Sequence, residues 1–142
     1  MSDPKSECEE LLSEAVPCAR KMLAEHREFF PFAVSMSEDG EITQVGVSTE
    51  DEQPASRELM DLLEVVLRNE AAEGTLRAAA VTYDIMIVPP GREEAQDAIA
   101  VALDHRADYS VVVVFPYAFA EDGALEVEAP FAMDGENRIF GE

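Results

Sequence analysis

The chain has 142 residues, which is enough for one compact domain. It carries 10 Lys and Arg against 31 Asp and Glu, a formal net charge of −21, while 47% of its residues are hydrophobic. This apolar fraction excludes a disordered acidic chain, and the lack of a long apolar run excludes a membrane-spanning helix. The charge excludes a binder of nucleic-acid phosphates. We therefore expect one globular domain over residues 1–142, with neither nucleic acid nor membrane among its partners.

The negative charge is divided almost evenly between the two halves of the chain, so it belongs to the whole domain. A field of this sign attracts basic proteins and repels nucleic acid. One interpretation is solubility, including adaptation to a salty cytoplasm, and the others are recognition of a basic protein partner and mimicry of nucleic acid. The first residues contain no basic segment followed by an apolar run, which predicts a cytoplasmic protein. Cys8 and Cys18 are too far apart on a helix for a disulfide, so we expect free thiols.

The first predicted helix carries apolar residues at intervals of three and four from Cys8 to Leu23. Asp3 is suited to cap it, and Pro4 suits the first helical position. Pro17 lies on the polar side, so a bend there leaves the apolar stripe intact.

A hairpin is predicted next, because two alternating segments flank Asp39-Gly40, a strong turn signal. A two-residue turn pairs 36 with 43, 34 with 45 and 32 with 47, which places six alternating side chains on one face. These are Phe32, Val34, Met36, Thr43, Val45 and Val47.

A second amphipathic helix follows Pro54, extends through Leu67 and ends at Gly74. Two long strands, 79–87 and 99–103, come next. A connecting loop at 89–93 pairs 83 with 99 and 81 with 101. The segment 109–120 is apolar at successive positions, which predicts a strand buried on both faces, and a shorter strand follows Asp122-Gly123. The predicted fold is α+β, with a mostly antiparallel sheet of five or six strands, two main helices and the order α-β-β-α-β-β-β.

Small residues gather opposite the large apolar residues of the two long strands. With the pairing above, they line one face of two neighbouring strands, and a close-packed interior needs a neighbour to approach them. That neighbour is either a helix of this chain or another subunit, so these residues are the candidate interface of a homodimer. They are Ala78, Ala80, Ala98, Ala100 and Ala102.

Three residues form a candidate ligand or proton-transfer site: Tyr83, Asp97 and His105. Asp97 shares the face of Ile99, where apolar surroundings disfavour ionisation of a carboxyl group. His105 lies among carboxylates on a turn, an arrangement that tunes an imidazole. The simpler alternatives are a carboxylate at a strand start that reaches water, and a solvated turn histidine.

Other chemistry is not predicted. The two histidines and two cysteines lack zinc-ligand spacing, and the acidic turns lack the ligand series of a calcium loop. The sequence contains neither a glycine-rich phosphate loop nor a nucleophile-elbow motif. We therefore expect no metal, no cofactor and no catalytic residue.

Short motifs resemble small bacterial domains of unknown function that share an aromatic-Pro-Phe-Ala opening. They are Phe30-Pro31-Phe32-Ala33, Asp97-Ala98-Ile99 with Leu103-Asp104-His105, and Phe115-Pro116-Tyr117. This resemblance implies no activity. The order of elements is similar to that of profilin-like and roadblock α/β sandwiches, which implies a scaffold, an adaptor or a small-ligand sensor.

Three functional hypotheses follow from the sequence. The first is a non-enzymatic protein-interaction or adaptor module of the cytoplasm that forms a homodimer. The second is a small acidic secretion chaperone or immunity-type inhibitor that sequesters a basic effector. The third is a ligand sensor or enzyme that uses Asp97 and His105, with Tyr83.

Overall fold

The computed structural model describes residues 3–26, 29, 31–45, 56–107, 109–135 and 139–140. Predictions that involve Val47 and Pro54 fall outside these residues, as does Asp108, one of the carboxylates near His105 in the sequence. The elements are α1 (Pro4–His26), β1 (Phe32–Ser37), β2 (Ile42–Val45), α2 (Ser56–Ala72), β3 (Leu76–Ile87), β4 (Gln96–His105), β5 (Tyr109–Phe119), β6 (Leu125–Val127) and β7 (Phe131–Asp134). The α+β class and the predicted order of elements are confirmed, with two short strands at the end of the described chain.

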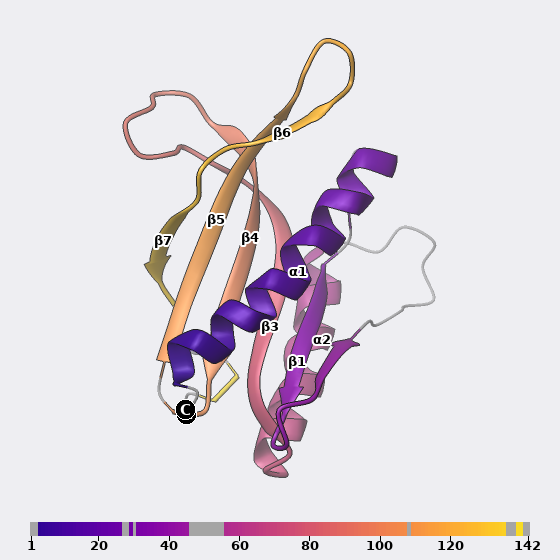
Figure 1. Ribbon diagram of the computed structural model, residues 1–142, viewed down its shortest axis with the longest axis vertical. Coiled ribbons are helices and arrows are strands. Elements are labelled where there is room, and N and C mark those ends of the chain that lie inside the picture. The colour runs from indigo at the N-terminus through magenta and orange to yellow at the C-terminus, as the bar shows by residue number, and fades with distance from the viewer. Residues whose placement is uncertain are drawn as a thin grey trace.

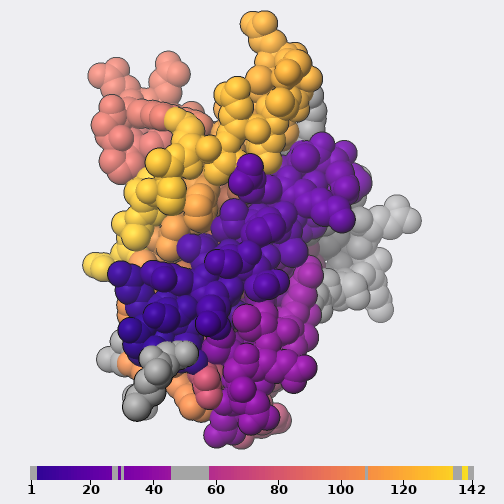
Figure 2. Space-filling model, in the orientation of Figure 1, coloured from indigo at the N-terminus to yellow at the C-terminus, as the bar shows by residue number. Residues whose placement is uncertain are grey.

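Within the described ranges, the strands form one antiparallel sheet in the order β2-β1-β3-β4-β5-β6, and β7 also pairs with β5. The two helices cover opposite faces of this sheet, as Figure 1 shows, and we call these the α1 face and the α2 face. In Figure 2, α1 crosses the visible face, and the β3–β4 and β5–β6 hairpins project beyond it. Neither helix is both long and apolar enough to cross a membrane.

Helix α1 begins where the sequence predicts. The backbone N–H of Ser6 donates to Asp3 Oδ1 at 2.7 Å, which is an N-cap, and Pro4 is the first helical residue. The helix continues through Pro17, and its buried stripe extends on both sides of that proline. The stripe packs on the α1 face against Val34, among others.

The β1–β2 register differs by one residue from the predicted register. Met36 pairs with Ile42 and not with Thr43. Gly40 has φ +89°, and the backbone N–H of Ser37 donates to the carbonyl of Glu41, so the loop has three residues and not two. Because one residue of shift turns every side chain of a strand to the other face, the prediction of one shared face is wrong.

The β3–β4 register also differs by one residue. Ile87 pairs with Gln96 across a loop of residues 88–95, which is longer than the predicted 89–93, and Tyr83 therefore pairs with Ala100. Ala78 and Ala80 lie on the α1 face beneath helix α1.

The three alanines of β4, Ala98, Ala100 and Ala102, lie on the opposite face, so the predicted face lined by all five alanines is wrong. Among these five alanines, Ala102 alone keeps exposed surface. The other four, Ala78, Ala80, Ala98 and Ala100, are fully buried within the chain. The prediction of a homodimer therefore loses the support of an exposed face lined by alanines, and it stays a prediction.

Strands β6 and β7 lie end to end along one edge of β5. Tyr117 pairs with Val127, whereas Val114 pairs with Phe131, so residues 128–130 insert one extra residue opposite β5. This bulge turns the odd-numbered residues from the α1 face in β6 to the α2 face in β7. Met133 is therefore placed over the α2 face of the sheet.

Candidate functional site

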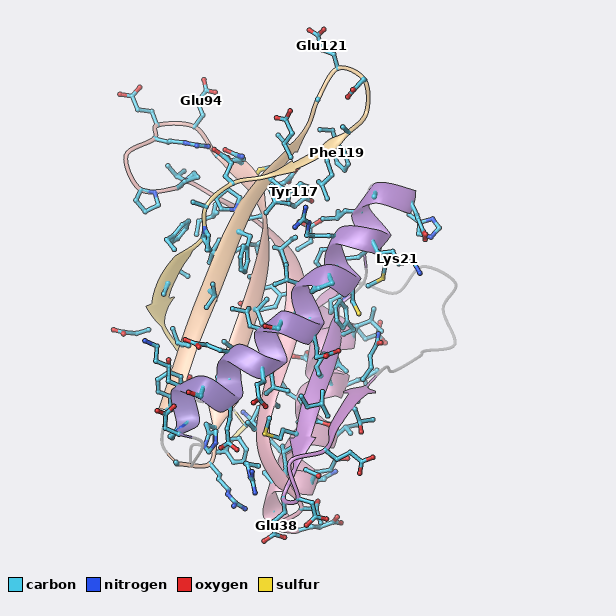
Figure 3. All side chains as sticks on the ribbon, in the orientation of Figure 1. Lys21, Glu38, Glu94, Tyr117, Phe119 and Glu121 are labelled. Carbon is cyan, nitrogen blue, oxygen red and sulfur yellow. The ribbon has the colours of Figure 1, made fainter. Side chains whose placement is uncertain are left out.

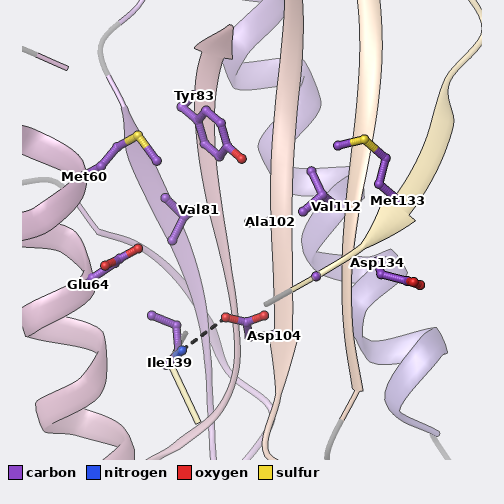
Figure 4. Close-up of a pocket in the computed structure, with 11 residues that line it drawn as sticks. Met60, Glu64, Val81, Tyr83, Ala102, Asp104, Val112, Met133, Asp134 and Ile139 are labelled. Carbon is purple, nitrogen blue, oxygen red and sulfur yellow. Dashed lines mark hydrogen bonds between the residues drawn. The ribbon is translucent and has the colours of Figure 1, made fainter. Parts of the chain in front are cut away.

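A groove of about 390 Å³ lies on the α2 face, between helix α2 and strand β7. Figure 4 shows α2 on one side and β7 on the other, with the groove residues of β3, β4 and β5 between them. Eleven residues line it: Met60 and Glu64 from α2, Val81 and Tyr83 from β3, Ala102 and Asp104 from β4, Val112 from β5, Met133 and Asp134 from β7, and Gly135 and Ile139 beyond it.

The groove exists because no large side chain or helix fills the space above β4. Helix α2 contacts mainly β1 and β3, and the central position of the floor is Ala102, flanked by Val81 and Val112. At the wall beyond β7, the backbone of Gly135 lies very close to strand β5. A Cβ atom at this position would overlap Ser110 Oγ and lie 2.8 Å from the backbone of Ser110 and Val111. Only glycine fits there without a shift of the wall.

Strand β5 shows how the two faces differ. Val113 is partly buried against the core beneath α1, whereas its neighbour Val112 lines the groove. The prediction that this strand is buried on both faces is wrong here, because Val113 on the α1 face and Val112 on the α2 face both keep exposed surface. Val114, two residues further along, is fully buried.

Two carboxylates, those of Glu64 from α2 and Asp104 from β4, lie at one end of the groove, and its lining contains no Lys, Arg or His among the described residues. Asp134 of β7 also lines the groove, but it pairs with the α1-face residue Val111, and its side chain points away from the groove in Figure 4. Asp104 is buried and accepts hydrogen bonds from Ser110 Oγ at 2.6 Å and from the backbone N–H of Ile139 at 3.2 Å. These bonds hold its carboxylate in place at the floor.

The three residues of the predicted proton-transfer site do not converge. Tyr83 lies in the groove, on the α2 face (Figure 4). Asp97 and His105 are on the α1 face of β4, eight residues apart, which corresponds to about 26 Å along a strand. Asp97 is exposed near the start of β4, in agreement with the simpler alternative.

His105 is buried, in contrast to the solvated turn histidine considered above. The backbone N–H of Ala107 donates to Nδ1 at 3.0 Å, so the proton is on Nε2, 2.8 Å from Glu7 Oε1. Arg77 Nη1 donates to Glu7 Oε2 at 2.7 Å. Glu7 thereby links the first turn of α1 to β3 and β4, and the cluster is structural. The sequence offered no periodic signal for it, because Glu7 is seventy residues from Arg77.

Two further groups bear on nucleophilic and acid chemistry. Both cysteines are free thiols, as predicted, and burial raises the pKa of Cys8 to about 12, which disfavours the thiolate.

Tyr117 donates its hydroxyl to both oxygens of Asp84, at 2.9 and 3.0 Å. Burial raises the pKa of Asp84, the Tyr117 bond opposes that effect, and the nearby charge of Asp97 adds to it. Within the residues described, no three acidic, His or Cys groups are placed to hold a metal ion.

We expect Asp84→Asn to raise the free energy of unfolding at pH 7. The folded state binds the Asp84 proton more tightly than the unfolded state, so stability falls as pH rises through the folded pKa and stays lower above it. An amide avoids this cost and still accepts a bond from Tyr117. Urea denaturation at pH 7 and pH 4 measures the effect, which should shrink at the lower pH. Glu93→Gln, at an exposed position, is the control, and an equal gain in both variants would contradict this explanation.

The chain matches no protein-family model, and no curated protein or solved structure is significantly similar to it. The resemblances in short motifs and in element order therefore transfer no site to this chain. The groove was not predicted from the sequence. Its one signal was the small residue Ala102 of β4, which leaves the floor open between Val81 and Val112.

Proposed function

We propose that the protein is a non-enzymatic protein-interaction module that holds a basic segment of a partner protein in the groove. The observation that carries this proposal is the composition of the groove: an apolar floor and walls, two carboxylates and no cationic side chain in its described lining. A concave, mostly apolar site with a few polar groups is the usual form of a binding site.

Charge complementarity supports a basic occupant. The net charge of −21 attracts cations toward the whole surface, and this raises the rate of encounter with a basic partner. In the groove, Val81, Ala102 and Met133 supply apolar surface for the stem of a Lys or Arg side chain, or for an apolar neighbour. An acidic segment would meet the like charges of Glu64 and Asp104.

A secretion chaperone or immunity-type inhibitor is the alternative within this class, and it uses the same groove when the basic partner is an effector protein. The cytoplasm is the compartment that the sequence predicts for either role. A sensor or enzyme that relies on Asp97 and His105 together is disfavoured, because these side chains stand at opposite ends of β4.

Titration with labelled peptides tests the proposal. We expect a peptide of repeated Lys-Lys-Leu-Leu, the Lys–Leu peptide, to bind with one-to-one stoichiometry, measured by fluorescence anisotropy, and a peptide of repeated Glu-Glu-Leu-Leu not to bind. Affinity for the basic peptide should fall with added salt, because part of the attraction is long-range. Equal binding of the two peptides, or only non-saturable binding of the basic one, would refute the proposal.

A further inference from the structure

The groove has two chemically different ends. Tyr83 on β3 pairs directly with Ala100 on β4, and Asp104 is four residues further along the same face of β4. At the rise of a strand, this places the level of Tyr83 about 13 Å from Asp104. Met60, Tyr83 and Met133 surround the apolar end, as Figure 4 shows, and the two carboxylates lie at the other.

The width of the groove favours an extended occupant. Its floor runs from β3 to β5, which is two strand spacings or about 10 Å between backbones. The side chains of Met60 and Met133 project from the two walls and narrow this space. A helix with its side chains is about 10–12 Å across, so a helix does not fit between the walls, whereas a single extended chain does.

On these grounds we infer that the groove recognises an extended segment in which an apolar residue and a Lys or Arg are two positions apart. This inference rests on the proposed function. Side chains two positions apart in an extended chain point the same way and are about 7 Å apart. The apolar side chain lies at the Tyr83 end, and the flexible four-carbon stem of a lysine covers the remaining distance to Asp104 and Glu64.

Peptides of identical composition test the spacing. Each has one Leu and one Lys in a background of Ser and Thr, with Lys two positions after Leu in the first peptide and three positions in the second. Because alternate side chains of an extended chain face opposite ways, we expect the two-position peptide to bind at least about tenfold more tightly. Equal affinities would overturn the inference. Tighter binding of the three-position peptide, which is the result expected of a helical ligand, would also overturn it.

A charge variant separates this inference from the proposed function. Glu64 is partly exposed on α2 and its carboxylate faces the groove in Figure 4, so Glu64→Gln removes a groove carboxylate without touching the core. We expect the affinity for the two-position Lys peptide to fall several-fold, and the affinity for a Leu-only peptide to stay unchanged. Glu121→Gln, at the tip of the β5–β6 hairpin in Figure 3, is the matched control. If neither the two-position nor the three-position Lys peptide binds while the Lys–Leu peptide does, the spacing rule fails and the proposed function stands. If no basic peptide binds, both fail.

Discussion

Replacement of Glu7 by Ala is expected to lower the free energy of unfolding by about 3–5 kcal/mol at pH 7, because it leaves buried polar partners without their anion. Glu7 is 7% exposed and accepts hydrogen bonds from Arg77 and His105. These bonds join the first turn of α1 to the two central strands. Urea denaturation followed by circular dichroism measures the loss. Glu10→Ala, on the exposed side of the same helix, is expected to change stability by less than about 0.5 kcal/mol.

The same contact has a predicted pH dependence. Burial raises the pKa of Glu7, but the hydrogen bonds from His105 and Arg77 outweigh burial and hold that pKa below its usual value of 4.5. The stabilisation is therefore complete above pH 4.5 and is lost as pH falls through the folded pKa. Glu7→Gln keeps the size of the side chain and one acceptor, so it should lose less stability than Glu7→Ala and lose this pH dependence. A difference between wild type and Glu7→Gln that stays constant from pH 7 to pH 3 would contradict this account.

Filling the groove is expected to abolish binding of a basic segment. Ala102 is partly exposed at the centre of the floor, so Ala102→Phe places an aromatic ring where the ligand would lie, at little cost to the core. We expect the affinity for the Lys–Leu peptide to fall at least about a hundredfold, the scale of losing a central contact. The control is Ala118→Phe, which adds the same ring to an exposed position of β5, six residues beyond the groove residue Val112.

The comparison of these two variants separates the groove from general electrostatic attraction. Both keep the net charge of −21, so attraction to the acidic surface is the same in each. A loss of binding in Ala102→Phe alone places the ligand in the groove. Undiminished binding in a folded Ala102→Phe protein would mean that the peptide binds elsewhere.

Local patterns were enough to predict the elements. The apolar stripe of α1 with its Asp3 cap is a property of neighbouring residues, as is the turn at Gly40 between β1 and β2. The strand pairings were less predictable. They depend on whether a loop has two residues or three, or five or eight, and a single residue inverts a whole strand. The alanines of β3 and β4 were therefore assigned to one face when they occupy two.

The candidate site depends on contacts that no local pattern contains. The bulge at residues 128–130 aims Met133 at the groove, yet its sequence gives no periodic signal because β6 and β7 are each only a few residues long. Asp104 and Glu64 come together only when α2 packs on the sheet. His105 was singled out as a candidate ligand or proton-transfer residue, but its partner Glu7 is 98 residues away, and its role is to fix α1.

Backbone amide chemical shifts measured while the Lys–Leu peptide is added test most directly whether the groove is the binding site. We expect the largest chemical-shift changes at Tyr83, Ala102 and Met133, and we expect them to saturate at one equivalent of peptide. Changes confined to the projecting hairpins, around the exposed Met86 and the acidic tip at Glu121, with none in the groove, would contradict this prediction.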